Sequence, residues 1–300
     1  MIHSDKNSLL LSTGLGLKGV GEILSSCKST EEVETKLRDF GEKYLKRYNL
    51  FKTYKDGVFA GEIKLPLIPI ISGMPGAGKT SLAREVATAF GIGDVMGGDA
   101  IRASYRELIS KEEHPEFFTS VYGAWQFVGD GKETEENIVK GFYLQAKIMN
   151  NLMERIVADR GIRDGESMVI EYLHFLPSQY DSNILNHPSV IPIVLRVDSM
   201  EEWRRRIEIR DRISHLKGNS QRLIPALEKY RMMQDVQCED AKKVGVPVIP
   251  SDNMKEAYEK IMNIIFEKIE RIIETKDMSA ENIEKIKRVM EERSLNPDKK

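Results

Sequence analysis

Short apolar runs and longer amphipathic stretches alternate along the chain. The apolar runs lie at residues 68–71, 167–171, 191–197 and 246–249, and the segment 94–99, which ends in a carboxylate, is predicted as a further short strand. Between them, apolar residues recur at helical spacing, as Ile148, Leu152 and Ile156 do within the stretch 133–160. Strands that are apolar throughout and separated by helices are typical of a parallel sheet covered on both faces. The pattern therefore predicts an α/β fold with a five-stranded parallel sheet.

The first residues of the chain read differently from the rest. A glycine-rich segment at 11–21 indicates turns or a flexible segment, although it superficially resembles a dinucleotide fingerprint. Ser29 and Glu32 form a capping box that begins an amphipathic helix, and 58–63 is predicted as a short strand. We accordingly divide the chain into an N-terminal extension, a main domain with a helical lid, and a charged helix and frayed tail: 1–62, 63–275 with the lid around 200–222, and 276–300.

The overall charge of the chain is close to neutral, because 45 basic and 47 acidic residues give a net charge of −2. No field of one sign points to nucleic acid or to a membrane surface as a partner. Cys27 and Cys238 lack metal-ligand spacing, which indicates reduced thiols, and no apolar run reaches the length of a membrane span. We expect a cytoplasmic protein without a nucleic-acid or membrane partner, and the sequence leaves a homo-oligomer open.

The segment 73–80, Gly-Met-Pro-Gly-Ala-Gly-Lys-Thr, matches G-x-x-x-x-G-K-[ST] at every position. An apolar run precedes it and helix-forming residues follow, which is the strand–loop–helix context of a phosphate-binding loop. Backbone N–H groups of such a loop surround the phosphates, Lys79 reaches the outer phosphates, and the Thr80 hydroxyl ligates Mg²⁺. We predict that a nucleoside triphosphate and Mg²⁺ are bound by Gly73, Pro75, Gly76, Ala77, Gly78, Lys79, Thr80 and Ser81.

Two carboxylates follow predicted strands, at the sheet edge where ligands bind in parallel α/β folds. Glu171 ends the strand 168–171 and is predicted to order Mg²⁺ and its waters, as the acidic residue of a Walker-B strand does. Asp99 ends the second strand and can accept or orient the proton of an acceptor hydroxyl, with Arg102 beside it to hold an anionic acceptor. The alternatives are a surface glutamate and an aspartate that caps the next helix and pairs with Arg102.

Arginines cluster at 203–212, where Arg206 and Arg210 share one helical face. In a kinase such a helix is a mobile lid whose guanidinium groups stabilise charge on the transferred phosphoryl group. The alternative is a basic surface helix or a nucleic-acid patch. His174 could contact the acceptor or be structural, and the aromatic residues around Trp125 are expected to be core or pocket wall.

Several segments in a fixed order resemble a known family. They are GMPGAGKT at 73–80, D-x-I-R at 99–102, TSVYGAW at 119–125, VIEYLHFLP at 169–177, R-x-x-x-R at 206–210 and GVPVI at 245–249. In this order they resemble the archaeal 2-phosphoglycerate kinase family from about residue 65 to 270. The resemblance implies a P-loop kinase fold, ATP with Mg²⁺, and a small acceptor that carries a carboxylate and a phosphate.

The resemblance implies that Lys79 and Thr80 bind ATP and Mg²⁺, that Asp99 and Arg102 lie on the acceptor side, and that Arg206 and Arg210 belong to the lid. Together with the sequence pattern, it leads to the following assignments. Phosphoryl transfer is assigned to Lys79, Asp99, Glu171, Arg206 and Arg210, with Thr80 and Glu171 on the metal side. The acceptor is predicted to contact Asp99, Arg102, Arg106, Ser120, Tyr122, Trp125, Tyr172 and His174.

The chain also departs from that family at positions near these residues. Members that act on 2-phosphoglycerate usually read S-T-D-x-I-R, H-T-S-S-Y and I-E-G-V-H, whereas this chain has Gly97, Gly98, Phe118, Val121 and Tyr172 there. A site built for a compact polar acceptor loses affinity when its hydrogen-bonding groups are replaced by apolar ones. The departures therefore favour an acceptor with the same anionic ends and apolar groups between them.

Mevalonate 3-phosphate is such an acid, and the mevalonate 3-phosphate 5-kinase of Thermoplasma-type archaea is similar to this family. The sequence thus favours formation of mevalonate 3,5-bisphosphate, in archaeal isoprenoid biosynthesis, over formation of 2,3-bisphosphoglycerate from 2-phosphoglycerate. A polynucleotide-type kinase, a nucleic-acid-dependent ATPase and a regulatory nucleotide-binding switch are the remaining alternatives.

Overall fold

A computed structural model describes residues 3–213, 215, 218–275, 284, 286–289 and 291 of the chain. The charged helix and tail predicted for 276–300 lie largely outside these residues.

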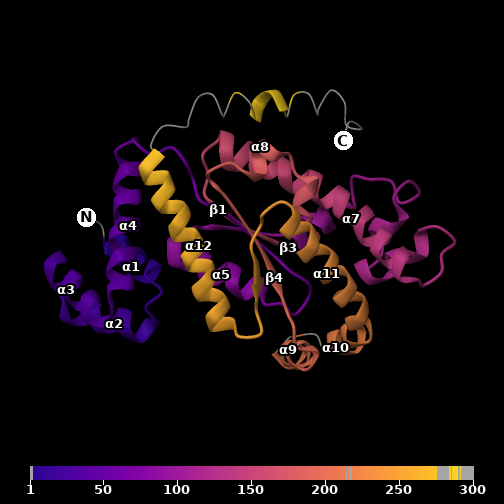
Figure 1. The fold of residues 1–300 in the computed structure, drawn as a ribbon, viewed down its shortest axis with the longest axis horizontal. Helices are drawn as coiled ribbons and strands as arrows, with labels where there is room; N and C mark the ends of the chain where they lie inside the picture. Colours follow the sequence, from indigo (N-terminus) through magenta and orange to yellow (C-terminus); the bar gives the residue numbers. More distant parts are fainter. Residues whose placement is uncertain are drawn as a thin grey trace.

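A five-stranded, all-parallel sheet forms the centre of the molecule (Figure 1). Its strands are β1 Ile68–Ser72, β2 Asp94–Gly97, β3 Met168–Tyr172, β4 Val190–Arg196 and β5 Val248–Pro250, and they lie in the order β2-β3-β1-β4-β5. Every residue of β1 is buried, as its apolar sequence requires for a central strand between two helical layers. The predicted fold class is therefore confirmed.

The strand order places a topological switch point at β1. Both neighbours of β1, β3 and β4, come later in the chain, and Ser72 at its end is level with Tyr172 and Val194. Chain connections leave β1 and its neighbours toward opposite sides of the sheet, which opens a crevice beyond the carboxyl ends of the strands. The phosphate-binding motif follows β1 directly and so occupies this crevice.

Helices cover both faces of the sheet. Helices α5 Lys79–Phe90 and α12 Met254–Thr275 lie on one side in Figure 1, and α7 Glu135–Ile156 and α11 Leu227–Lys243 lie on the other. Their buried apolar residues, among them Val86 and Ile265 on the first side and Met153 and Ala241 on the second, make up the core. Each layer thus buries the apolar stripe that its helical spacing predicted.

Four N-terminal helices pack outside α5 and α12. They are α1 His3–Ser12, α2 Leu17–Ser26, α3 Thr30–Phe40 and α4 Glu42–Phe59. Arg47 of α4 forms an ion pair with Glu259 of α12 at 2.8 Å, which ties the extension to the main part of the chain. The capping box of Ser29 and Glu32 is confirmed at the start of α3.

Two predictions for the N-terminal residues are wrong. Most of the glycine-rich stretch is helical, because Val20 and Ile23 of α2 are buried against neighbouring helices and this packing outweighs the low helix propensity of Gly19 and Gly21. No strand forms at 58–63 in the described chain, because α4 continues to Phe59 through buried Phe51 and Tyr54.

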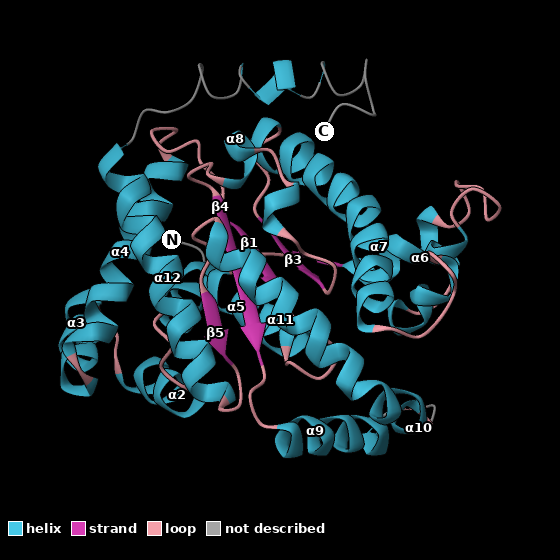
Figure 2. Cartoon of the chain, turned by 45° about the vertical axis from the view of Figure 1, so that its right-hand side comes forward, coloured by secondary structure: helices cyan, strands magenta, loops and turns pink. Residues whose placement is uncertain are grey.

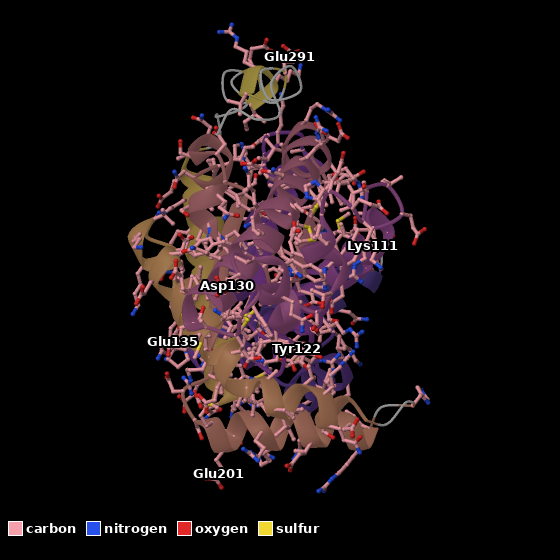
Figure 3. The ribbon with its side chains drawn as sticks, turned by 90° about the vertical axis from the view of Figure 1, so that its right-hand side faces the viewer. Lys111, Tyr122, Asp130, Glu135, Glu201 and Glu291 are labelled. Carbon is pink, nitrogen blue, oxygen red and sulfur yellow. The ribbon has the colours of Figure 1, made fainter. Side chains whose placement is uncertain are left out.

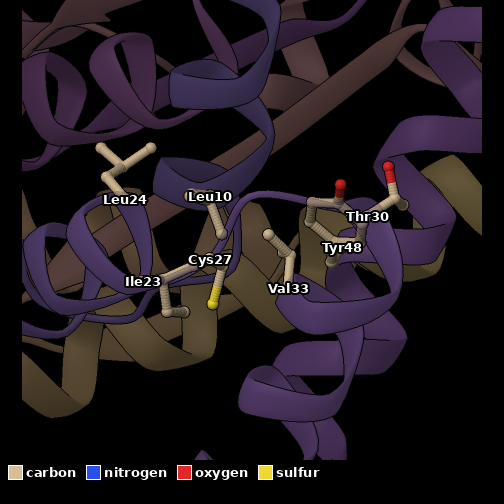
Figure 4. Close-up of a pocket in the computed structure, with 7 residues that line it drawn as sticks. All are labelled: Leu10, Ile23, Leu24, Cys27, Thr30, Val33 and Tyr48. Atoms are coloured by element: carbon tan, nitrogen blue, oxygen red, sulfur yellow. The ribbon is translucent and has the colours of Figure 1, made fainter.

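The N-terminal helices enclose a small, mainly apolar pocket, which Cys27 and Val33 help to line (Figure 4). Neither Cys27 nor Cys238 forms a disulfide.

The remaining elements are short helices around the sheet and one long helix beneath it. They are α6 Gly98–Tyr105, η1 Pro115–Phe118, η2 Val121–Phe127, η3 Val157–Arg163, η4 Pro177–Gln179, α8 Ser182–Leu185, α9 Met200–Ile213, α10 Asn219–Leu223 and η5 Ile224–Ala226. Figure 2 shows α9 and α10 below the arrowheads of the central strands, on the side of the crevice. None of the described helices is both long enough and apolar enough to cross a membrane.

Candidate active site

The segment 73–80 folds as a compact loop between β1 and α5. Gly76 and Gly78 have φ values of 86° and 93°, a backbone conformation that side-chain-bearing residues rarely adopt. The N–H of Ala77 donates to the carbonyl of Met74 at 3.0 Å and closes a turn in the loop. The loop ends at Lys79, the first residue of α5, so backbone N–H groups and the positive end of the helix dipole meet at one place.

Lys79 and Glu171 face each other at the edge of this loop. The Lys79 Nζ lies 3.9 Å from the Glu171 Oε2, and the side chains are only 10% and 14% exposed. Burial lowers the pKa of Lys79 and raises the pKa of Glu171, and each charge partly offsets the effect on the other. Among the described residues, the Glu171 Oε2 has no hydrogen-bond partner. The buried carboxylate oxygen and the buried ammonium group do not form a hydrogen bond with each other. A bound polar ligand would supply hydrogen-bond partners to these groups.

The residues at this edge fit a magnesium ion bound together with phosphates. Within the described part of the chain, no group of three or more His, Cys, Asp or Glu could hold a metal ion. Mg²⁺ sites in phosphoryl-transfer enzymes need fewer protein ligands, since one or two side chains, waters and phosphates complete the shell. Thr80 is exposed in the first turn of α5, and its side chain lowers the pKa of Glu171, which places the two predicted metal-side residues together.

Asp99 lies on the same edge, two residues beyond the end of β2 and not at the strand end that the sequence predicted. Strand β2 ends at Gly97, and Asp99 is exposed in the first turn of α6. The N-cap residue of α6 is Gly97, with no side-chain cap hydrogen bond among the described residues, so Asp99 is not the helix cap that the alternative required. Its charge raises the pKa of both Lys79 and Glu171, so the carboxylate lies within electrostatic range of the pair at the phosphate loop.

Arg102 and Arg106 hold the segment that follows η1. The Arg102 Nη2 donates to the carbonyl of Phe117 at 3.1 Å and also to the carbonyl of Thr119, which the Arg106 Nη2 reaches at 3.1 Å. Burial, and then the neighbouring charge of Arg106, lowers the pKa of Arg102 to about 10. The Arg102 Nε is buried without a hydrogen-bond partner in the described structure. Arg102 therefore positions a loop and keeps one donor unused.

His174 lies behind these arginines and does not line the crevice surface. It is 1% exposed, and its Nε2 donates to the Oε1 of Gln145 at 3.0 Å. Gln145 in turn donates to the carbonyl of Thr119 at 3.3 Å. Burial, followed by the charges of Arg102 and Lys79, keeps the pKa of His174 well below its usual range, so the ring is neutral. The structural interpretation of His174 fits this position, and Gln145 is a supporting residue that sequence reasoning missed.

Tyr172 was predicted to contact the acceptor, and the structure does not bring it to the site. It is 1% exposed, and its hydroxyl bonds to the Asn150 Oδ1 at 2.8 Å and to the Tyr180 hydroxyl at 2.7 Å. Side chains alternate along a strand, so Tyr172 points to the opposite face of β3 from Glu171. A Cβ atom at Gly98 would lie 2.2 Å from the Cβ of Tyr172. The glycine at 98 therefore makes room for the tyrosine at 172, and the two departures form one packed pair.

We expect Gly98→Ala to lower the free energy of unfolding by about 2 kcal/mol, because the added methyl overlaps Tyr172 and its backbone. In a Tyr172→Gly background most of this loss should disappear. Gly93→Ala is the matched control, since its added Cβ would meet nothing within 4 Å. Urea unfolding of the four variants measures the coupling, and equal losses for Gly98→Ala in both backgrounds would contradict a packed pair.

The predicted aromatic wall lies in η2. Tyr122 packs edge-to-face on Tyr230 of α11 at 5.8 Å between ring centroids, and the Lys229 Nζ lies 5.6 Å from the ring centroid of Trp125. In Figure 3, Tyr122 appears on the viewer's face of the molecule with Asp130. Ser120 precedes η2 and is half-buried. The charge of Asp99 is among the causes that raise the pKa of Tyr230. The sequence did not identify Tyr230 as part of this wall, because α11 reaches η2 only in the folded chain.

The two predicted lid arginines of α9 have different surroundings. The Arg206 Nε donates to the Glu202 Oε1 at 2.7 Å, and its Nη2 donates to the carbonyls of Ser251 and Asp252, each at 2.6 Å. Arg210 is exposed, and its charge lowers the pKa of Lys79 and of Glu171. Arg210 thus lies within electrostatic range of the Lys79–Glu171 pair, whereas Arg206 is tied to the segment after β5.

The parallel sheet, the phosphate-binding loop and the facing Lys79–Glu171 pair define a P-loop kinase type of fold and site. No family model matches the chain, but individual proteins do. It is 29% identical to the 2-phosphoglycerate kinase of Methanopyrus kandleri over 252 residues, which cover 84% of this chain and 74% of that protein. It is 30% identical to the 2-phosphoglycerate kinase of Methanocaldococcus jannaschii over 73% of this chain and 69% of that protein.

The chain is also 31% identical to the mevalonate-3-phosphate 5-kinase of Thermoplasma acidophilum over 196 residues, which cover 65% of this chain and 94% of that protein. The chain therefore belongs to the archaeal 2-phosphoglycerate kinase family, to which this mevalonate-3-phosphate 5-kinase is also similar. As a member it is a kinase, an enzyme that transfers a phosphoryl group to a hydroxyl group.

Proposed function

We propose that the chain transfers the γ-phosphoryl group of ATP to a hydroxyl group of a small acid that carries a carboxylate and a phosphate. One observation carries the proposal. The incompletely satisfied Lys79–Glu171 pair at the phosphate loop shares its sheet edge with Asp99, whose charge acts on both residues. Phosphoryl transfer requires this combination of phosphate binding, charge neutralisation and a carboxylate that faces the acceptor hydroxyl.

On the nucleotide side, backbone N–H groups of the loop bind the phosphates, and Lys79 neutralises charge on the outer ones. Thr80 and Glu171 are the residues that would hold Mg²⁺, which supplies further charge neutralisation on the phosphate oxygens when it is bound. Arg210 is the cation of α9 that we assign to these groups, because its charge lowers the pKa of both Lys79 and Glu171. The low exposure of Lys79 and Glu171 strengthens each of these electrostatic interactions.

On the acceptor side, Asp99 accepts or orients the hydroxyl proton, and the free Nε of Arg102 binds an anionic end of the acceptor. Arg102 and Arg106 are held in place by the carbonyls of residues 117 and 119, so their orientation is largely fixed before an acceptor arrives. A fixed pair of cations beside one carboxylate suits a small, doubly anionic acceptor.

We expect Arg102→Ala to raise the KM of the acceptor by about ten- to a hundredfold, because a charged hydrogen-bond partner of the acceptor is lost. The KM of ATP should change by no more than about threefold, since the phosphate loop is untouched. Steady-state kinetics with each substrate varied in turn measures the split. Equal increases in both KM values would show that Arg102 acts through the general structure of the site and does not bind the acceptor.

For the acceptor itself we propose mevalonate 3-phosphate. Two of the differences from the 2-phosphoglycerate kinases, Gly98 and Tyr172, form a packed pair, and a third, Val121, lies in the core at 4% exposure. These three positions therefore carry no information on the acceptor. The observation that remains is Gly97, where a side chain would approach the Glu171 Oε1 to 3.4 Å, together with half-buried Phe118 beside Arg106. Both changes remove polar groups beside the acceptor arginines and the metal-side carboxylate.

A second candidate acceptor, 2-phosphoglycerate, is favoured by a different observation. The match to the Methanopyrus kandleri enzyme spans 252 residues and therefore extends beyond the main domain expected at 63–275, whereas the match to the Thermoplasma acidophilum enzyme spans 196. This chain therefore shares a segment outside the main domain with the 2-phosphoglycerate kinase of Methanopyrus kandleri, and this shared segment favours 2-phosphoglycerate as the acceptor.

An ADP-release screen with purified protein, ATP and Mg²⁺ tests the proposed function. The panel contains both acceptors, other small phosphorylated hydroxy acids, and RNA and DNA with free 5′-hydroxyl ends. We expect release with one or both of the first two compounds and background rates with the nucleic acids. Release that depends on polynucleotide would instead support a nucleic-acid-dependent ATPase or a polynucleotide-type kinase.

A further inference from the structure

The phosphate loop contains a four-residue turn at 74–77, whose central peptide joins Pro75 and Gly76. Met74 and Ala77 are joined by a backbone hydrogen bond of 3.0 Å, Pro75 occupies the second position, and Gly76 has a φ of 86° at the third. Proline at the second position and glycine with positive φ at the third are the features of a type II turn. A type I turn with the same end points differs mainly in that the central peptide is rotated by about half a turn.

A side chain from α9 contacts this peptide directly. The indole Nε1–H of Trp203 in α9 donates to the carbonyl oxygen of Pro75 at 2.6 Å. Trp203 is fully buried, and a Cβ atom at Gly76 would lie 3.0 Å from its ring. The indole therefore packs on the turn and binds its central carbonyl.

The position of Trp203 is itself fixed by its surroundings. The guanidinium of Arg231 lies 5.5 Å from its ring centroid, and the same arginine donates to the carbonyls of Val197 and Asp198 at the end of β4. Ile207, one turn further along α9, is 1% exposed and also packs near Gly76. The donor is thus held against the turn by β4 and by the helix on which it lies.

We propose that Trp203 is a positioning residue for the phosphates of the nucleotide. In a planar trans peptide the C=O and N–H bonds point in opposite directions. A Pro75 carbonyl that is fixed toward the indole therefore turns the Gly76 N–H away from α9 and into the loop, where the phosphates bind. Without the indole N–H, the peptide can rotate and remove one phosphate donor. This inference rests on the proposed nucleotide site and assigns a specific residue to its preorganisation.

Trp203→Phe tests the inference, because phenylalanine keeps an aromatic ring at the position and removes the N–H. We expect the Kd of ADP to rise roughly tenfold, the effect of one hydrogen bond, while the Kd of adenosine, measured in the same calorimetric titrations, stays unchanged. The melting temperature should fall by only a few degrees. Tyr54→Phe is the matched control, since it removes a comparable buried donor, to the carbonyl of Leu65 at 2.9 Å, away from the turn.

The outcomes separate this inference from the proposed function. The role of Trp203 is overturned if the Trp203→Phe variant binds ADP as tightly as the wild type does, or if its affinities for ADP and adenosine fall equally. Either result leaves the proposed kinase function intact. Wild-type protein that binds no adenine nucleotide overturns the proposed function itself.

A measurement on the wild type covers the case in which the variant does not fold. The chain has two tryptophans, so ¹⁵N-tryptophan labelling gives two indole N–H signals. We expect the Trp203 signal to exchange slowly with solvent, because this N–H is buried and bonded. The signal should shift when ADP is added and remain in place with adenosine, because hydrogen bonds on the two sides of one peptide polarise each other. A Trp203 signal that is unmoved at saturating ADP overturns the inference.

Discussion

Lys79→Ala is expected to lower kcat/KM for phosphoryl transfer by about three orders of magnitude or more. Lys79 is the cation closest to the predicted position of the outer phosphates, and its low exposure makes its interaction with them stronger than it would be in water. The substitution also leaves Glu171 buried without its facing cation, which raises the pKa of Glu171 further. Coupled assay of ADP formation at saturating acceptor measures the loss.

Lys260→Ala is the control for this variant, because Lys260 is exposed on α12 and away from the loop. It should retain the wild-type rate. If Lys79→Ala kept a rate within tenfold of the wild type, the loop would not be the site of phosphoryl transfer. Circular dichroism of both variants would show whether a loss of rate reflects a loss of fold.

Asp99→Asn is expected to lower kcat by about two to four orders of magnitude if the carboxylate takes the acceptor proton. Asparagine keeps the size of the side chain and removes its charge and basicity. The KM of ATP should stay within about threefold of the wild type, because Asp99 lies on α6 and outside the phosphate loop. Single-turnover rates at several pH values separate the chemical step from product release.

Asp94→Asn is the matched substitution, at the start of β2, where the carboxylate forms an ion pair with Arg160 at 3.0 Å. It should affect activity little, since this surface pair lies at the opposite end of the strand from α6. A kcat of Asp99→Asn within about threefold of the wild type would show that the residue neither accepts the proton nor orients the hydroxyl.

The sheet could be predicted from the sequence because its central strands are short apolar runs bounded by turns, and the partly exposed edge strand β2 is bounded by glycines. The order of the strands could not be predicted, because it depends on the face of the sheet that each connection between successive strands crosses. The helices α1 and α2 were missed because Gly14, Gly16, Gly19 and Gly21 suggested turns, whereas burial of Val20 and Ile23 stabilises a helix through Gly19 and Gly21. Local propensity was outweighed there by contacts with residues far along the chain.

Some residues of the candidate site could likewise be predicted from the sequence, and others could not. The phosphate loop could be found because its residues are contiguous, and the structure brings Glu171 and Asp99 to it as strand-end positions predict. Tyr172 was assigned to the site because it follows Glu171, but alternation along β3 places the two side chains on opposite faces. Trp203 was missed because its partner, Pro75, lies 128 residues away in the sequence.

The central claim, phosphoryl transfer from ATP to a phosphorylated hydroxy acid, is tested most directly by ³¹P NMR. The purified protein is incubated with ATP, Mg²⁺ and equal concentrations of mevalonate 3-phosphate and 2-phosphoglycerate. We predict loss of the γ-phosphate signal and growth of a new phosphomonoester signal on an acceptor, with mevalonate 3,5-bisphosphate formed faster than 2,3-bisphosphoglycerate. Faster formation of 2,3-bisphosphoglycerate would contradict the choice of acceptor. Inorganic phosphate as the only product, or ATP left intact, would contradict the central claim.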